Sequence, residues 1–344
     1  MAALTKKLGA WGRLVRLPNL LTAWGDPVAG FALVTALMWA GKGHHMYDGV
    51  YYAQGAWDQL HAFTPMLGRL AALAGAAIAF YAMGMVQNDL AHVKRDRATR
   101  PDRPIGSGAV APREAAMGVT FLTLVGMLLA FLAGRSNGGG MAATMGVALA
   151  LVATITLYNY VAAFNRGLAP VVMGACRALS ILLGAAAANP KLLTSLAAAR
   201  ELWPVWVALA CVWAYIGLVT FIASRETETR AIGLVRWAPS LVMFVGVELT
   251  VLWMLNHSDD VLRHSAWMFL GQGAVLWSML CGARLSGMCT PATTGKTIGM
   301  FIRGQLWIQA MLIATAGVFG GLVAAGVLLG WPINRLLSKR FPPS

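Results

Sequence analysis

Charged residues are scarce in this sequence, and acidic residues are the scarcest. Of its 344 residues, 12% are charged, and Asp and Glu together number 13 against 27 Lys and Arg. A soluble domain carries about twice that share of charge, whereas 58% of this chain is hydrophobic. The composition therefore excludes an ordinary soluble domain and predicts an integral membrane protein surrounded by a lipid bilayer.

Other features that the chain lacks narrow its class further. It has only four cysteines and no CxxC pair, and three of the four lie inside apolar runs, so we expect small buried side chains. The N-terminal segment lacks a short apolar core followed by a cleavage site, which predicts a retained first helix. The net charge of +14 is explained by basic cytoplasmic loops and anionic lipid headgroups, so nucleic acid is not an expected partner.

Long apolar runs recur from near the N-terminus to Trp331. A membrane-spanning helix needs about 20 mostly apolar residues, and nine segments meet this criterion. Their approximate bounds are 18–41, 66–88, 114–134, 141–163, 168–188, 203–223, 238–255, 265–283 and 305–330. Because they fill the chain, we predict an all-α, polytopic membrane protein with a single domain over residues 1–344.

The basic residues between these spans predict the orientation of the chain. They gather before the first span and after the second, fourth, sixth and eighth spans, which the positive-inside rule assigns to the cytoplasm. We therefore expect a multi-pass protein of the cell membrane with a cytoplasmic N-terminus. One feature disagrees, because nine crossings place the basic tail of Arg335, Lys339 and Arg340 on the outer side.

The few acidic residues are concentrated at the ends of two spans. Asp89 and Asp96 lie at or after the end of the second span, and Glu226 and Glu228 at the end of the sixth, on the same side of the membrane. On a helix, Asp89, His92 and Asp96 stand at i, i+3 and i+7 and share one face. An exposed carboxylate at a helix C-terminus interacts unfavourably with the helix dipole, which costs about 0.3–1 kcal/mol for each group. A compensating cation is therefore expected.

Two sources of that cation are open from the residues alone. Neighbouring Arg and Lys side chains would make an ordinary salt-bridged loop at headgroup level. Alternatively, two carboxylate clusters with basic residues between them suit Mg²⁺ ions that bridge a diphosphate, because carboxylate oxygens hold the metal and Arg or Lys take the remaining phosphate charge.

The segment from Asn88 to Gly108 carries a family resemblance. Its strings NDLAHVKRD and RPDRPIGSG resemble the first aspartate-rich motif of the UbiA superfamily of intramembrane prenyltransferases. RLPNL from Arg16, Leu157 and Tyr158 with Arg166, and SRETE from Ser224 are similar to further family motifs in the same order. MGACRALSILLG from Met173 resembles the UbiA-like branch encoded in ebo gene clusters. The match covers roughly residues 13 to 303 and implies a bundle of about nine helices.

The resemblance implies a site for prenyl transfer. Mg²⁺ would be held by Asp89, Asp96, Glu226 and Glu228, with Asn88 orienting the first cluster. The partners would be a polyprenyl diphosphate and a small-molecule or lipid acceptor. The expected substrate-binding residues are Asn19, His92, Lys94, Arg100, Arg103, Tyr158, Arg166, Arg177 and Arg225.

Some residues depart from the family pattern. His92 and Ser224 stand where the two acidic motifs carry aspartates, Gly106 replaces a proline, and Asn165 replaces a lysine. Neutral histidine prefers softer ions than Mg²⁺, so His92 is interpreted as a donor to a phosphate oxygen. These departures keep open a non-catalytic relative that binds an isoprenoid or lipid diphosphate as a carrier. A transporter is disfavoured because few acidic residues lie near the midplane.

Polar residues inside the spans are further candidates. Arg177 lies within an apolar run, where a charge usually lines a cavity or meets a partner. Tyr158 is interpreted either as a ring that stabilises a carbocation or as an interfacial anchor. Asp26 shares a helical face with Asn19 in the first span, and its role, like that of Glu248, is left open.

Overall fold

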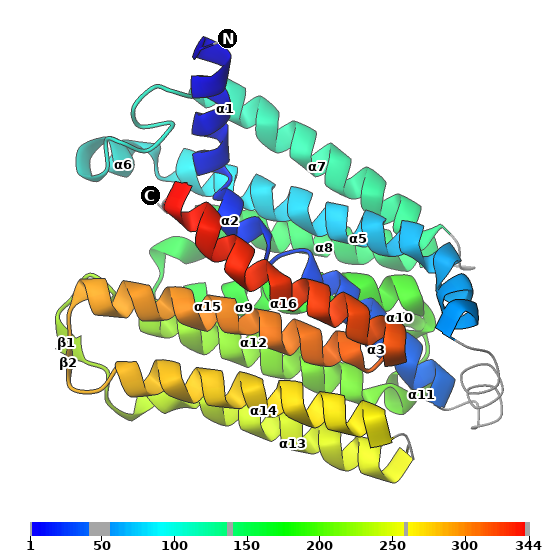
Figure 1. Ribbon diagram of the computed structural model, residues 1–344. Coiled ribbons are helices and arrows are strands. Elements are labelled where there is room, and N and C mark those ends of the chain that lie inside the picture. The colour runs from blue at the N-terminus through cyan, green and yellow to red at the C-terminus, as the bar shows by residue number, and fades with distance from the viewer. Residues whose placement is uncertain (1, 41–55, 136–139, 258–260, 341–344) are drawn as a thin grey trace.

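The computed structural model describes residues 2–40, 56–135, 140–257 and 261–340, and within them the chain is a bundle of helices with one small sheet (Figure 1). The long helices are α3 (Gly25–Ala40), α5 (Ala56–Ala91), α7 (Pro112–Gly134), α8 (Gly140–Tyr160), α9 (Leu168–Ala188), α12 (Trp203–Ala223), α13 (Ala238–His257), α14 (Val261–Arg284), α15 (Pro291–Ala314) and α16 (Gly317–Arg340). This architecture confirms the predicted all-α polytopic fold.

Shorter elements cap the two ends of the bundle. α1 (Ala2–Leu14), α2 (Leu17–Leu20), α6 (Val93–Thr99) and the antiparallel pair of β1 (Arg230–Ala231) and β2 (Met288–Cys289) lie toward one end, which we call the α6 end. α10 (Lys191–Thr194) and α11 (Leu196–Glu201) lie at the opposite end. Two 3₁₀ turns, Ala162–Phe164 and Gly233–Trp237, complete the connections.

Nine helical segments in the described ranges are long and apolar enough to cross a membrane, which is the predicted number. They are not the same nine, because α15 and α16 each contribute one and no segment of α14 is among them. The bounds of the last predicted span, 305–330, are wrong. The helix breaks after Ala314 and restarts at Gly317, whose φ of 73° is favourable only for glycine, so the predicted span joins the end of α15 to the start of α16. The predicted span 265–283 lies within α14, a 24-residue helix packed in the same bundle.

This correction moves the C-terminal basic residues to the other end of the molecule. α15 and α16 run in opposite directions, and α16 ends near α2 and α6 (Figure 1). The side-chain amide of Asn334 donates to the carbonyl oxygen of Pro18 at 2.7 Å, which ties the end of α16 to α2. Arg335 therefore lies at the α6 end with the other basic loops, and the predicted outer position of the tail is wrong.

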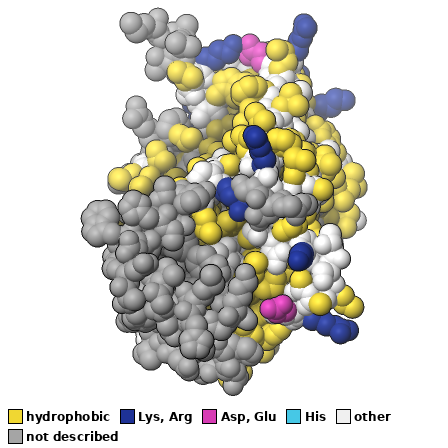
Figure 2. All heavy atoms as spheres, turned by 90° about the vertical axis from the view of Figure 1, so that its right-hand side faces the viewer, with side chains coloured by type: hydrophobic (Ala, Val, Ile, Leu, Met, Phe, Trp, Pro, Cys, Tyr) yellow, Lys and Arg dark blue, Asp and Glu magenta, His cyan; other side chains and the backbone are white. Residues whose placement is uncertain are grey.

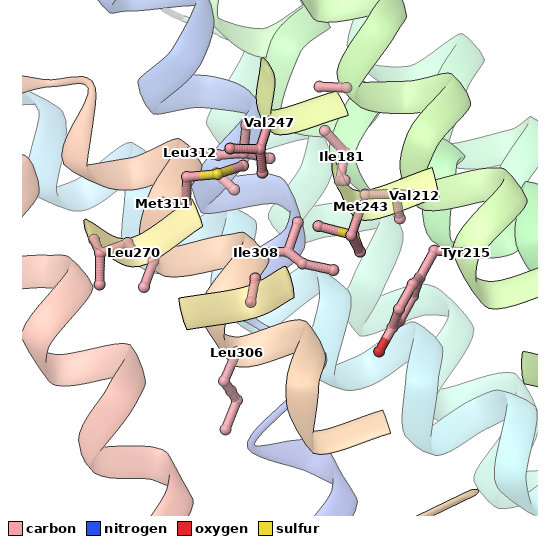
Figure 3. Close-up of a cluster of buried hydrophobic side chains, with 14 of the residues drawn as sticks. Ile181, Val212, Tyr215, Met243, Val247, Leu270, Leu306, Ile308, Met311 and Leu312 are labelled. Atoms are coloured by element: carbon pink, nitrogen blue, oxygen red, sulfur yellow. The ribbon is translucent and has the colours of Figure 1, made fainter. Parts of the chain in front are cut away.

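The interior holds tightly packed apolar side chains. Figure 3 shows part of this core, where Val212, Tyr215 and Met243 meet Ile308 and Leu312. α3 lies inside the bundle against α5, α9 and α15. At the α3–α9 contact, a Cβ on Gly30 would overlap the carbonyl oxygen of Ile181, and one on Gly184 would overlap that of Pro27. Glycine at both positions lets the two backbones approach closely.

The outer surface of the bundle is also apolar. Phe121, Leu124 and Phe269 expose most of their side chains, as expected of helices that face lipid. Figure 2 looks onto the end that carries α10 and α11 and shows hydrophobic side chains over much of the described surface, with few charged ones. Length, hydropathy and surface together identify a multi-pass membrane protein.

Candidate functional site at the α6 end

The first acidic motif lies at a break between two helices. α5 ends at Ala91, His92 takes a non-helical conformation with φ of −103° and ψ of 10°, and α6 begins at Val93. The prediction that Asp89, His92 and Asp96 share one face of a continuous helix is therefore wrong. The turn at His92 instead directs Asp89 and Asp96 toward a common basic partner.

That partner is Arg103. Its Nη1 atom lies 2.7 Å from Oδ2 of Asp96 and 3.4 Å from Oδ1 of Asp89, and all three side chains are at least 95% buried. One nitrogen thus stands between two carboxylates from different helices. A buried charge is tolerated when it is paired in this way, so the predicted compensating cation is a side chain of the same loop.

The loop after α6 holds Arg103 in place through its own backbone. The Arg103 amide donates to the Arg100 carbonyl, and the Ser107 amide donates to the Arg103 carbonyl at 2.8 Å. Ile105 and Val110 are fully buried in a small apolar cluster with residues of α1. The RPDRPIGSG segment is therefore an ordered turn that covers the ends of α5 and α6.

Arg16 lies beside the acidic cluster, although it was not among the predicted site residues. Its Nη2 atom lies 4.0 Å from Oδ1 of Asp89. Its backbone is in the left-handed region, with φ of 51° and ψ of 57°, which costs a non-glycine residue about 1–3 kcal/mol and occurs preferentially at functional sites. The signal that could have identified it is its position at the head of the RLPNL string.

An amide network positions the residue next to Asp89. Asn88 donates to Oδ1 of Asn159 at 3.3 Å, and Asn159 donates to the carbonyl oxygen of Gly84 at 3.0 Å. Gln87 bonds both Asn159 and Thr156. Asn159 lies one position after the predicted Tyr158 and was missed, because an amide at the end of an apolar span has no distinctive sequence signal.

His92 is a buried imidazole beside the two aspartates. It is 5% exposed, its Nδ1 atom has no hydrogen-bond partner in the described structure, and its ring meets Phe164 edge-on with centroids 4.7 Å apart. Burial, reinforced by the positive charge of Arg95, lowers the pKa of His92 below its ordinary value. A neutral ring with a free nitrogen is available for a hydrogen bond to a ligand.

The second acidic motif lies at the same end but is open to its surroundings. Glu228 and Arg225 are exposed, Glu226 is half-buried, and Arg166 forms an exposed ion pair with Glu228 at 3.5 Å. Within the described residues, no three side chains of His, Cys, Asp or Glu are grouped to hold a metal ion. The two acidic motifs therefore do not form one ligand set by themselves, and their joint role stays a prediction.

Arg177 and Asp26 form a second buried ion pair, deeper in the bundle. Nη1 of Arg177 lies 2.9 Å from Oδ2 of Asp26, whose other oxygen accepts from Gln305 at 2.9 Å and from Gln309 at 2.6 Å. The pair adjoins a break in the first span, where residues 21–24 separate α2 from α3 and the Thr22 carbonyl accepts from Arg177 and Gln309. The predicted shared face of Asn19 and Asp26 is wrong because of this break.

The remaining predicted residues are less enclosed. Lys94 and Arg100 are exposed at α6, Asn19 is half-buried in α2, and Tyr158 is half-buried against the core of α8 and α9. Glu248, whose role was left open, accepts a hydrogen bond from Gln272 at 2.9 Å. All four cysteines are free thiols. Of the three inside apolar runs, Cys176 and Cys281 are buried as predicted and Cys211 is only half-buried, whereas Cys289, outside those runs, is buried.

No protein-family model and no curated protein matches this chain. A solved structure described as that of digeranylgeranylglyceryl phosphate synthase in membranes does, over 94% of this chain and 99% of that one, at a TM-score of 0.56 and 16% identity. The two chains share a fold. This agrees with the polytopic helix bundle implied by the sequence motifs.

Proposed function

We propose that this protein is an intramembrane prenyltransferase, which moves a polyprenyl group from a polyprenyl diphosphate to a small-molecule or lipid acceptor. The observation that carries the proposal is the buried cluster of Asp89, Asp96 and Arg103 at one end of a bundle with a prenyltransferase fold. Basic loops surround this end, and the positive-inside rule therefore makes it the cytoplasmic face, with the N-terminus on the same side.

The donors of the first cluster fit a magnesium ion. Asp89 and Asp96 share one cationic group, Nη1 of Arg103. Oδ1 of Asp96 is buried without a hydrogen-bond partner among the described residues. Mg²⁺ is usually bound by one or two carboxylates together with substrate phosphates, which this pair provides. When bound, the ion would neutralise charge on the leaving diphosphate. We assign Glu226 and Glu228 to the same role on the facing helix end.

The basic residues of the site would hold the diphosphate itself. Arginine presents a planar fork of donors that matches phosphate oxygens, and Arg16 and Arg103 already point such forks at the acidic cluster. Lys94, Arg100 and Arg225 are exposed at the same end and are assigned to the outer phosphate oxygens, with Arg166 beside Glu228. The reaction breaks the bond between the allylic carbon and the diphosphate oxygen and joins that carbon to the acceptor.

Other side chains would position the prenyl group and the acceptor. We assign Asn88, held by Asn159, to the orientation of the first carboxylate cluster, and half-buried Asn19 to contact with the substrate. The ring of Tyr158 would stabilise an allylic cation through its face. The neutral ring of His92 donates to a phosphate oxygen, and Arg177 contributes a positive charge deeper in the bundle.

A direct assay tests the proposal. Protein purified in lipid nanodiscs is incubated with radiolabelled prenyl diphosphates of several lengths and with Mg²⁺, and release of diphosphate is measured. We expect release by the wild-type protein and none by Asp89→Asn. Asp102→Asn is the matched control, because Asp102 lies in the same motif but is exposed, and it should retain activity. Undiminished turnover in the presence of chelator would refute the metal role.

One observation favours a second candidate function. The Arg103 guanidinium fills the position between Asp89 and Asp96 that a metal ion would take, and a permanent internal cation suits a protein that binds an isoprenoid diphosphate without cleaving it. In that case the wild-type protein would bind radiolabelled prenyl diphosphate but would release no diphosphate, whichever acceptor molecule is added.

A further inference from the structure

Three arginines from three helices lie near one another around Cys281. Arg284 ends α14, Arg303 lies in the middle of α15, and Arg335 lies near the end of α16. On each helix a tryptophan shares the face of the arginine, and the arginine lies nearer the α6 end. The tryptophans are Trp277 in α14, Trp307 in α15 and Trp331 in α16. The spacings are seven residues in α14 and four in α15 and α16, which place each pair on one face of its helix.

The tryptophans bring these three faces together. The rings of Trp277 and Trp331 meet edge-on with centroids 4.2 Å apart, and those of Trp307 and Trp331 do so at 6.5 Å. Met300 of α15 joins the neighbouring helix, because its carbonyl accepts from Trp277 at 2.9 Å and its sulfur accepts from Arg284 at 3.0 Å. The arginines therefore lie one or two helical turns from this cluster of tryptophan rings, toward the α6 end.

The charges of this cluster are not balanced by protein carboxylates. Arg303 is half-buried inside a membrane-spanning helix, and Cys281 and Arg335 lie close enough to act on it electrostatically. None of the three arginines forms an ion pair with a described Asp or Glu. Charges of one sign that lie near one another repel, so a bound anion would stabilise the arrangement.

The surroundings indicate where that anion comes from. Arg284 and Arg335 are exposed, and the neighbouring surface carries exposed apolar side chains, including Leu280 of α14 and Ile333 and Leu336 of α16. A basic pocket between transmembrane helices, flanked by apolar surface and aromatic rings, is typical of a site for an anionic lipid headgroup. Free phosphate would contact only the arginines, whereas the acyl chains of a phospholipid would also contact the exposed apolar side chains.

We propose that the arginine cluster of Arg284, Arg303 and Arg335 binds the phosphate headgroup of an anionic membrane phospholipid. The arginines hold the phosphate oxygens through charge-assisted hydrogen bonds, and the acyl chains lie along α14 and α16. This site shares no residue with the acidic cluster, and the proposal does not depend on the proposed prenyl transfer.

Lipid binding to the full-length protein tests the proposal. Native mass spectrometry measures the binding of phosphatidylglycerol and of phosphatidylcholine, and thermal unfolding is followed with each lipid and with inorganic phosphate or diphosphate. We expect phosphatidylglycerol to bind at least tenfold more tightly than phosphatidylcholine and to raise the unfolding temperature. Arg303→Gln with Arg335→Gln should abolish that preference, and Arg335→Gln alone, at an exposed position, should weaken it.

The matched control is Arg113→Gln, which removes the same charge from an exposed position at the start of α7. It should leave the phosphatidylglycerol preference within twofold of wild type. Equal binding of phosphatidylglycerol by the double variant and the wild type would overturn the proposal. An equal thermal shift with inorganic phosphate would overturn the assignment to a lipid.

Discussion

Nη1 of Arg103 lies 2.7 Å from Oδ2 of Asp96 and 3.4 Å from Oδ1 of Asp89, so one guanidinium serves two buried carboxylates. Removal of one partner from a buried ion pair costs about 3–5 kcal/mol, because the other charge is left uncompensated. The stability of the α6 end and its capacity to bind a cation therefore depend on the same three residues.

Replacement of Arg103 by glutamine should destabilise the protein. Two buried carboxylates lose their common partner, so we expect the free energy of unfolding to fall by about 3–5 kcal/mol in the absence of Mg²⁺. Added Mg²⁺ should restore part of the loss if the ion binds between Asp89 and Asp96. Thermal unfolding with and without Mg²⁺ measures both effects, and Arg97→Gln, at an exposed position of α6, should show neither.

His92→Asp should lower the concentration of Mg²⁺ needed for half-maximal diphosphate release. The change adds a carboxylate beside Asp89 and Asp96, at a position where the present side chain has an unused Nδ1 atom. A titration of activity against Mg²⁺ checks this. Complete loss of activity in a folded protein would show that the imidazole performs a task of its own.

The buried imidazole also predicts a pH dependence of stability. Burial lowers the pKa of His92 in the folded protein, whereas the unfolded chain binds a proton at the ordinary histidine pKa of about 6.5. The unfolded state therefore binds more protons as the pH falls through that value, and the free energy of unfolding decreases from pH 7 toward pH 5. His92→Gln should flatten this slope in thermal unfolding measured across the interval, and an unchanged slope would refute the assignment.

Gly184→Ala should be strongly destabilising. The added Cβ would overlap the carbonyl oxygen of Pro27, so α3 and α9 would have to separate along their contact. We expect a loss of about 1–3 kcal/mol, the range for overpacked interiors, or failure to accumulate in membranes. Gly146→Ala is the control, because nothing lies within 4 Å of a Cβ at that position of α8, and it should be neutral or slightly stabilising.

A double-mutant cycle on Asp26 and Arg177 should show strong coupling. Each single change, Asp26→Asn or Arg177→Met, leaves one charge buried without its partner, which costs about 3–5 kcal/mol. The double variant should lose less than the sum of the two, because no uncompensated charge remains. Thermal unfolding of the four proteins measures the coupling energy, and additive effects would contradict the ion pair at 2.9 Å.

Much of the architecture was readable from residue order because hydrophobic length and charge are local properties. Apolar runs predicted the transmembrane helices, and the two acidic motifs were correctly expected at one end of the bundle. The last span was misread because the break at Ala314–Gly317 lies within a long, mostly apolar run, where Thr315 is the only polar residue of the break and no charge marks it. That single break reversed the predicted side of Arg335.

The residues by themselves determined the class of protein and most of its apolar spans, and they singled out Asp89, Asp96 and Arg103 as candidates. Hydropathy and motif order are sufficient for this because each depends only on neighbours in the chain. Only the tertiary structure decided the partnerships: Arg16 with Asp89, Asn88 with Asn159, and Asp26 with Arg177. These pairs join residues up to 151 positions apart in the chain, and their contact depends on how helices cross, which no local pattern of residues specifies.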